Sequence, residues 1–99
     1  MEIQKTAAGD RLMLKVTGRL ETATAPQFDA EVKAISGDVK NLSVDFGGLE
    51  YVSSAGLRSI LLAQKMMNAR QGKMELSGVN QTVRHVFDIT GFSSVLTFV

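Results

Sequence analysis

The sequence predicts an α/β fold in which helices pack on a mixed, mostly parallel sheet of about four to five strands. Two patterns predict this fold. Segments of alternating apolar and polar residues are interleaved with segments whose apolar residues recur at helical spacing, in the order β-β-α-β-α-β-α-β. The chain has 99 residues, near the lower end of the usual size of a domain, so we expect one domain spanning residues 1–99.

The chain begins with two predicted strands. Apolar and polar residues alternate over residues 11–17, which is typical of a half-buried strand, and Gly18 should end that strand. A weaker strand around Ile3 precedes it. Residues 8–10, Ala-Gly-Asp, would form the hairpin turn between the two strands.

A first helix should begin near Thr24. The hydroxyl of Thr24 is expected to cap this helix, and Pro26 lies near the first helical position, where proline is favoured. Phe28, Val32 and Ile35 follow at helical spacing and give the helix one apolar face.

A third strand and a long helix make up the middle of the chain. The alternating apolar residues over 42–46 predict a strand that runs into Gly47-Gly48. The long helix should extend from about Ser54 to Arg70 and close at Gly72. The apolar residues on the broad side expected to face the sheet are Leu57, Ile60, Leu61, Ala63 and Met67.

The last third of the chain predicts a strand, a helix and a final strand. Residues 74–76 form the fourth strand, and Asn80 can cap a helix whose apolar face includes Val83, Val86 and Phe87. Gly91 lies just past the end of that helix. The apolar residues over 95–99 predict the last strand.

Composition and charge exclude several functional classes. Lys plus Arg number 11 against 10 Asp plus Glu, so the sequence lacks the basic excess that favours direct nucleic-acid binding. Cysteine is absent, which excludes disulfides, thiolate metal sites and a cysteine nucleophile. One histidine with scattered carboxylates predicts no metal or cofactor. With no secretory signal and no long apolar run, we expect a cytoplasmic protein that does not bind membranes.

Two adjacent serines mark the start of the long helix. Ser53 and Ser54 lie where a helix exposes unpaired N–H groups and the positive end of its dipole. Either hydroxyl can cap the helix, but a cap needs only one of them. The small residues Ala55 and Gly56 keep the surroundings of the other hydroxyl open, which suits the active site of another protein.

The segment from Asp45 to Leu57 carries a family resemblance. Its pattern, Asp-Phe-x-x-Leu-x-Tyr-Val-Ser-Ser-Ala-Gly-Leu, resembles the signature of STAS domains, which occur in bacterial anti-sigma factor antagonists. In that family, the serine of an Asp-Ser-x-Gly-Leu pattern is phosphorylated by a partner anti-sigma factor with kinase activity. The resemblance places this serine at Ser54. Ser53, which stands where many members have aspartate, is the second candidate.

Two further segments extend the resemblance over essentially the whole chain. Residues 18–22, Gly-Arg-Leu-Glu-Thr, resemble the family's Gly-x-Leu-Asp loop, which lies near the phosphorylatable serine. Glu21 stands at the position of the aspartate in that loop. Residues 83–87, together with Gly91-Phe92, resemble the late helix of the family and the turn beyond it.

The resemblance implies a STAS fold and a regulatory protein rather than an enzyme. The unphosphorylated form would bind an anti-sigma factor that is a serine kinase, which releases the sigma factor, and phosphorylation of Ser54 would switch this off. A phosphatase would remove the phosphate, and the free protein would be a monomer. The residues expected in the partner surface are Glu21, Thr22, Ser53, Ala55, Gly56, Arg58, Leu62 and Met66.

Leu62 and Met66 leave two interpretations open. They are spaced i and i+4 and point away from the main apolar stripe of the long helix. Either the buried stripe is wide enough to include them, or they form a partner contact rimmed by Arg58, with the adaptable Met66 at its centre.

Two other functions compete with the switch. A serine hydrolase would need a base, but His85 is the single histidine, and no Gly-x-Ser-x-Gly elbow occurs. A closer alternative, implied by the same family resemblance, is a STAS scaffold that is not phosphorylated, or a subunit of a larger signalling or lipid-transport assembly.

Overall fold

The computed structural model describes all 99 residues as a four-stranded sheet with three helices. The elements are β1 (Glu2–Ala8), β2 (Arg11–Leu20), α1 (Ala25–Lys33), β3 (Asn41–Val52), α2 (Ser54–Ala69), β4 (Lys73–Ser77), α3 (Gln81–Ile89) and a 3₁₀ turn, η1 (Phe92–Ser94). The strands lie in the order β1-β2-β3-β4, with β1 antiparallel to β2 and the other pairs parallel. The predicted fold class is therefore confirmed.

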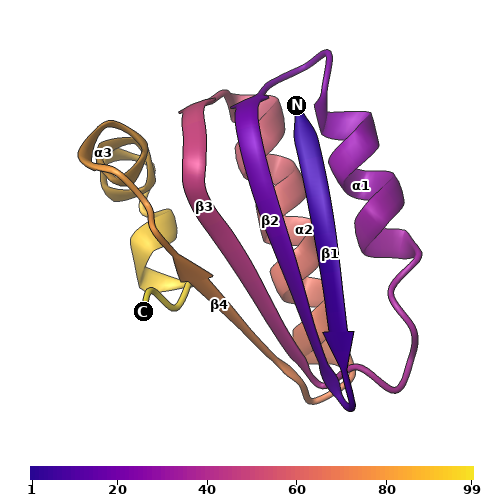
Figure 1. The fold of residues 1–99 in the computed structure, drawn as a ribbon. Helices are drawn as coiled ribbons and strands as arrows, with labels where there is room; N and C mark the ends of the chain where they lie inside the picture. The colour runs from indigo at the N-terminus through magenta and orange to yellow at the C-terminus, as the bar shows by residue number, and fades with distance from the viewer.

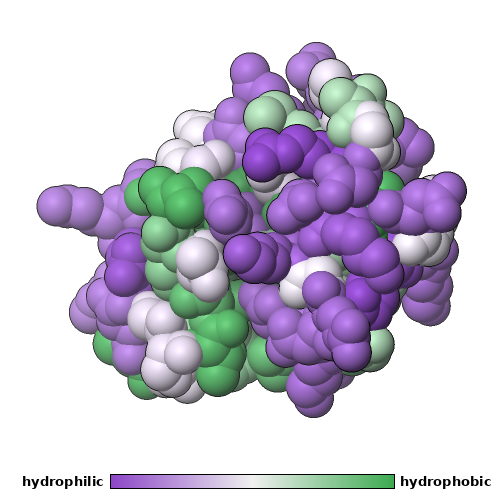
Figure 2. All heavy atoms as spheres, turned by 90° about the horizontal axis from the view of Figure 1, so that it is seen from below, coloured by the Kyte–Doolittle hydropathy of each residue, from purple (hydrophilic) through white to green (hydrophobic).

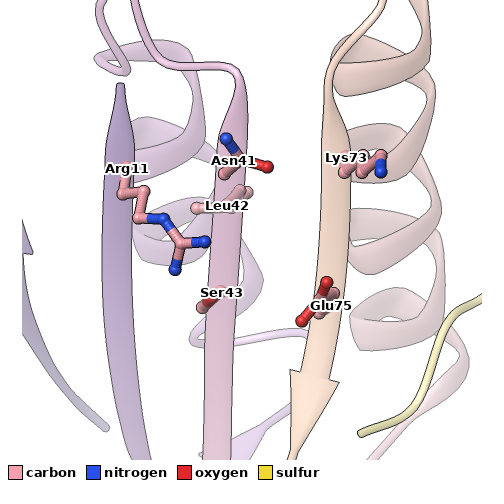
Figure 3. Close-up of a pocket in the computed structure, with 6 residues that line it drawn as sticks. All are labelled: Arg11, Asn41, Leu42, Ser43, Lys73 and Glu75. Atoms are coloured by element: carbon pink, nitrogen blue, oxygen red, sulfur yellow. The ribbon is translucent and has the colours of Figure 1, made fainter. Parts of the chain in front are cut away.

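The helices leave one face of the sheet open. Helices α1 and α2 cover the same face, and α3 lies to the side, beyond β3 and β4 (Figure 1). The alternating residues of β2 explain this arrangement, because Leu12, Leu14 and Val16 are buried whereas the residues between them are largely exposed. Figure 3 shows polar side chains of β2, β3 and β4 around a shallow pocket of ≈ 30 Å³ on the open face.

Strand β3 is longer than predicted. It continues through Gly47-Gly48 to Val52, so the predicted end of the strand at this glycine pair is wrong. The strands stay paired because the register between β2 and β3 shifts near this point. A Cβ on Gly48 would lie 2.5 Å from Cγ2 of Thr17, so this close approach requires a glycine. Strand β2 likewise passes its predicted end at Gly18 and reaches Leu20.

The predicted last strand shrinks to one bridge. Phe98 pairs with Leu76 in parallel, while Phe92–Ser94 form the 3₁₀ turn. Gly91 has a left-handed backbone (φ 80°), which turns the chain, and the ring of Phe98 packs 5.6 Å from that of Phe87. The apolar residues of this segment thus mainly cover α3. Figure 2 shows apolar atoms in a band on the left, the side where Figure 1 places α3 and the C-terminus.

The helix caps follow the sequence in one case and depart from it in another. Asn80 caps α3 as predicted, because its Oδ1 accepts from the N–H of Val83 (2.8 Å). Thr24 precedes α1, but its hydroxyl does not cap the helix. That hydroxyl instead donates to the carbonyl of Arg19 (2.7 Å) and accepts from the N–H of Glu21 (2.9 Å). Helix α1 ends at Lys33, so Ile35 is buried in the chain that follows the helix.

The apolar side of α2 faces the sheet, as predicted. Leu57, Ile60, Ala63 and Met67 are all buried, whereas Leu61 is half-buried at the margin of this stripe. No helix of the protein combines the length and the apolar character needed to cross a bilayer.

Candidate functional site

Ser53 is the residue that caps α2. Its backbone is extended (φ −96°, ψ 177°), and its Oγ accepts a hydrogen bond from the N–H of Gly56 (3.3 Å). Its carbonyl accepts from Leu57 (2.9 Å), and its own N–H donates to the carbonyl of Leu20 (3.0 Å). The half-buried Ser53 hydroxyl is therefore engaged in holding the start of the helix.

Ser54 is the first residue of α2, and its side chain is exposed. Its hydroxyl makes no hydrogen bond within the protein, so it is free to react. The two adjacent serines thus have different environments, because the Ser53 hydroxyl accepts a hydrogen bond from the first turn of the helix and the Ser54 hydroxyl faces solvent. Neither the sequence pattern nor helix propensity alone distinguishes them, since either hydroxyl could act as the cap.

Gly56 brings the start of α2 close to the end of β2. A Cβ at this position would lie 2.5 Å from the carbonyl oxygen of Leu20 and 3.0 Å from Cγ2 of Val52. Gly56 is buried, so it offers a partner almost no surface. Its predicted partner contact is therefore replaced by a positioning role, whereas its neighbour Ala55 is half-buried at the surface.

Arg19, near the end of β2, contacts both the loop that follows β2 and the end of β3. Nε of Arg19 lies 3.1 Å from Oε2 of Glu21, and the guanidinium of Arg19 lies 4.4 Å from the ring centroid of Tyr51. The Thr24 hydroxyl closes the same loop. Glu21 is therefore half-buried and already paired, while Thr22 is exposed. Sequence reasoning identified Glu21 and Thr22 but missed Arg19 and Tyr51, whose contact depends on the shifted register of β2 and β3.

The start of α2 carries an unopposed positive charge. Its first turn contains no acidic residue, and the exposed Arg58 forms no ion pair. Ser54 and Arg58 are four residues apart, so their side chains project from neighbouring turns on the same helix face. The dipole of α2 adds positive potential at the same end.

Leu62 and Met66 line a groove between α1 and α2. The groove has a volume of ≈ 250 Å³ and is lined by Asp29, Val32, Lys33, Leu62 and Met66. Leu62 is 51% exposed, whereas Met66 is half-buried and packs against the core. Each of the two open interpretations therefore fits one residue: Met66 belongs partly to the buried stripe, and Leu62 offers apolar surface.

His85 forms no hydrogen bond with either serine. It is exposed on α3, where the hydroxyl of the nearby Ser93 donates to Asp88. This hydrogen bond lowers the pKa of the Asp88 carboxyl, and the neighbouring Arg84 lowers it further. These contacts stay within α3 and the turn after it, so they supply no base for Ser53 or Ser54. No group of three or more His, Asp or Glu side chains gathers to hold a metal ion.

Comparison with known proteins identifies the family. A family model described as "Mlab, STAS domain" matches residues 3–97. This chain belongs to the STAS domain family. The Bordetella bronchiseptica protein BtrV, which bears the name of an anti-sigma factor antagonist, is 38% identical over 85 residues, covering 85% of this STAS chain and 73% of BtrV. The anti-sigma-B factor antagonist of Staphylococcus aureus is 23% identical over 97 residues, covering 97% of this chain and 90% of the relative.

Solved structures show the same STAS fold. The unphosphorylated anti-sigma factor antagonist SpoIIAA superposes with a TM-score of 0.78 at 19% identity, covering 99% of this chain and 87% of SpoIIAA. The phosphorylated form of SpoIIAA from Bacillus gives a TM-score of 0.77 at 20% identity, with 99% and 91% covered. A Thermotoga maritima protein reaches a TM-score of 0.89 at 17% identity, with 97% and 84% covered. At these identities the similarity is one of fold.

Proposed function

We propose that this STAS domain is an anti-sigma factor antagonist controlled at Ser54. The unphosphorylated form binds a partner anti-sigma factor and so releases the sigma factor. The same partner is a serine kinase, and transfer of phosphate to Ser54 ends the interaction until a phosphatase removes it. The observation that carries this proposal is the different environment of the two serine hydroxyls. The Ser53 hydroxyl caps α2, whereas the Ser54 hydroxyl is exposed and forms no hydrogen bond. The names of its relatives support the same role.

Phosphorylation at Ser54 should change the surface rather than the fold. A phosphate adds a charge of about −1.5 to −2 and three strong acceptor oxygens. At the start of α2 that charge meets free N–H groups and the positive end of the helix dipole, which favour it. The buried contacts below the site, such as that of Gly56 with Leu20, do not involve Ser54. Repulsion and loss of contact at the partner interface are therefore the expected effects.

The partner surface extends from the loop after β2 along the exposed side of α2. We place Glu21 and Thr22 beside the serines because the N–H of Ser53 donates to the carbonyl of Leu20, which precedes this loop. In the proposed surface Ala55 follows the serines, and the exposed Arg58 and Leu62 continue it along the helix. We assign Met66 to the floor of the adjoining groove, because it is half-buried. We assign no metal, nucleotide or other cofactor to this surface, and the catalytic groups come from the kinase.

The decisive experiment is a kinase assay with three matched proteins. The wild type, Ser54→Ala and Ser53→Ala are each incubated with a candidate anti-sigma kinase and ATP, and the products are analysed by mass spectrometry. One phosphate is expected on the wild type and on Ser53→Ala, and none on Ser54→Ala. Phosphate on Ser53 would show that the proposed assignment of the switch to Ser54 is wrong. If no candidate kinase phosphorylates the wild type, the proposed switch is rejected. Ser54→Asp should weaken binding of the anti-sigma factor and hence release of the sigma factor.

A scaffold is the second candidate, and one observation favours it. Ser53 stands where the family signature has aspartate, so no carboxylate is adjacent to Ser54 in the sequence. A STAS scaffold or a subunit of a signalling or lipid-transport assembly would use the same helix surface without phosphorylation. Stable binding of a partner whose affinity is the same for the wild type and for Ser54→Asp would favour the scaffold.

A further inference from the structure

Arg19 lies opposite Tyr51 because the pairing of β2 with β3 shifts by one residue. Gly18 still pairs with Leu49. Arg19 then pairs with Tyr51, which leaves Glu50 without a partner in β2. Opposite residues of neighbouring strands project from the same face of a sheet. The guanidinium of Arg19 therefore stacks on the ring of Tyr51, 4.4 Å from the ring centroid.

Arg19 also holds the carboxylate of Glu21. Its Nε donates to Oε2 of Glu21 (3.1 Å), whereas Oε1 of that carboxylate accepts no hydrogen bond within the protein. The backbone of Glu21 is held separately, because its N–H donates to the Thr24 hydroxyl (2.9 Å) and its carbonyl accepts from the N–H groups of Thr24 and Ala25 (3.0 and 2.7 Å). Both the backbone and the side chain of Glu21 are thus held in place, and Oε1 is left to accept from another molecule.

The cluster formed by Arg19, Glu21 and Tyr51 lies beside the proposed phosphorylation site. The carbonyl of Leu20 accepts from the N–H of Ser53 (3.0 Å), so the residues on either side of Leu20 are next to the start of α2. Figure 1 shows the ends of β2 and β3 close to this end of the helix. Tyr51 precedes Ser53 by two residues, a distance of about 7 Å along an extended chain. A protein that covers the start of α2 can therefore reach the cluster.

The contacts of the cluster matter for orientation more than for stability. The side chains of Arg19 and Glu21 are 55% and 34% exposed, and ion pairs with such exposure add little to the free energy of unfolding. A mobile glutamate side chain loses conformational freedom when it binds, and that loss weakens binding. Because Arg19 and Tyr51 hold Glu21 before any partner arrives, the loss on binding is smaller.

We propose that Arg19 and Tyr51 are positioning residues for a contact between Glu21 and the anti-sigma factor. The ring of Tyr51 orients the guanidinium, and the guanidinium holds one oxygen of Glu21. The other oxygen accepts from an N–H or O–H group of the partner. Neither Arg19 nor Tyr51 has to touch the partner in this role. The role rests on the proposed function, because Glu21 belongs to the proposed partner surface.

A double-mutant cycle separates positioning from direct contact. The full-length wild type, Arg19→Ala, Glu21→Ala and the double variant are titrated by calorimetry with the candidate anti-sigma kinase used in the phosphorylation assay. Arg19→Ala should weaken binding about threefold to tenfold, the effect of freeing one side chain, and this loss should disappear in the Glu21→Ala background. If Arg19→Ala weakens binding equally in both backgrounds, Arg19 contacts the partner itself and the positioning role is wrong.

A matched control removes the same charge elsewhere on the strand. The exposed Lys15→Ala on β2 should leave binding unchanged, and Arg19→Ala should unfold at the same urea concentration as the wild type. Equal losses of binding for Lys15→Ala and Arg19→Ala would show a general charge effect and overturn the proposal.

Variants of Tyr51 test the role of the ring. Phenylalanine also offers a ring face to a guanidinium, so Tyr51→Phe should retain most of the affinity, whereas Tyr51→Ala should lose about as much as Arg19→Ala. Arg19→Lys keeps the charge but not the planar group that both stacks and donates, so it should restore only part of the affinity. Full affinity of Tyr51→Ala would show that the ring does not position Arg19.

The free protein gives a readout that needs no partner. The Nε–H of Arg19 should give a resolved NMR signal with slowed hydrogen exchange, and Glu21→Ala should abolish that protection. Absence of protection in the wild type would show that Arg19 does not hold Glu21. If protection is present but the wild type binds no candidate anti-sigma factor, the proposed function fails, and this role fails with it. If the wild type binds and is phosphorylated but Arg19→Ala loses no affinity, the positioning role alone is wrong.

Discussion

The Cα of Gly56 approaches the carbonyl oxygen of Leu20 so closely that a Cβ at position 56 would lie 2.5 Å from that oxygen. The same carbonyl accepts the N–H of Ser53 (3.0 Å). One backbone group at the end of β2 therefore fixes both the cap of α2 and the distance between the helix and the sheet. The position of Ser54, immediately after the cap, follows from these two contacts.

Gly56→Ala should destabilise the fold and misplace the start of α2. The alanine methyl would clash with the carbonyl oxygen of Leu20, which is held in place by the strand and by its hydrogen bond with Ser53. Overpacking of this kind costs about 1–3 kcal/mol, and the better helix propensity of alanine recovers at most about 1 kcal/mol. Urea unfolding should show the loss. Gly37→Ala is the matched control, because a Cβ at position 37 would have no neighbour within 4 Å, and this variant should change stability little. Equal stability of both variants would contradict this account of Gly56.

Replacing Ser53 should lower the free energy of unfolding more than replacing Ser54. Ser53→Ala removes the hydroxyl that accepts from Gly56, and loss of an N-cap typically costs about 1 kcal/mol. Ser54→Ala removes an exposed, unbonded hydroxyl and should leave the free energy of unfolding within about 0.5 kcal/mol of the wild type. Thermal melting of the two variants side by side tests this. A larger loss for Ser54→Ala would mean that Ser54 is the cap.

Much of this fold could be predicted because local patterns agree with the final packing. The alternation over residues 11–17, the Asn80 cap and the apolar stripe of α2 all appear in the structure as expected. The length of β3 could not be predicted, since Gly47-Gly48 usually ends a strand, and only a shifted register with β2 allows pairing to continue. The prediction of a last strand was wrong because of a contact between distant residues. Phe98 packs on Phe87, and one bridge to β4 forms in place of a strand.

The candidate site divides in the same way. Both serines lie at the start of the helix, as the motif predicts, but the assignment of the cap to Ser53 required the structure. Gly56 belongs to the motif, yet its closest non-local neighbour, Leu20, is far away in sequence, and so its positioning role could not be inferred. The hydroxyl of Thr24 was a plausible cap from sequence, but it closes the neighbouring loop instead.

Arg58 should hold the phosphate of phosphorylated Ser54. It is exposed, forms no ion pair and projects from the next turn of the same helix face. A guanidinium beside the phosphate favours its dianion, so the second pKa of the phosphoserine should fall below its usual value of about 6. Phosphorus NMR titration of the phosphoprotein measures this pKa directly.

The contact between Arg58 and the phosphate should also make stability depend on pH. Because the second pKa of the phosphoserine is lowered in the folded state, the stability that this contact adds is present above the pKa of the unfolded chain. It is lost as the pH falls through the folded value. Arg58→Gln should raise the pKa towards the usual value, whereas Arg58→Lys should keep most of the shift. Identical titration curves for the wild type and Arg58→Gln would show that the helix dipole alone acts on the phosphate.

Leu62 is the better probe of the partner surface than Met66. Leu62 is 51% exposed, so Leu62→Glu should leave the free energy of unfolding nearly unchanged. Met66 is half-buried against the core, so Met66→Glu should both destabilise the fold and weaken binding. If Leu62 is an anchor of the interface, its replacement should weaken binding of the anti-sigma factor about tenfold or more.

Calorimetric titration against the partner measures this loss of binding, with Ile89→Glu at the exposed Ile89 of α3 as the control. Equal losses for Leu62→Glu and Ile89→Glu would show a general charge effect, and no loss for Leu62→Glu would remove the groove between α1 and α2 from the interface.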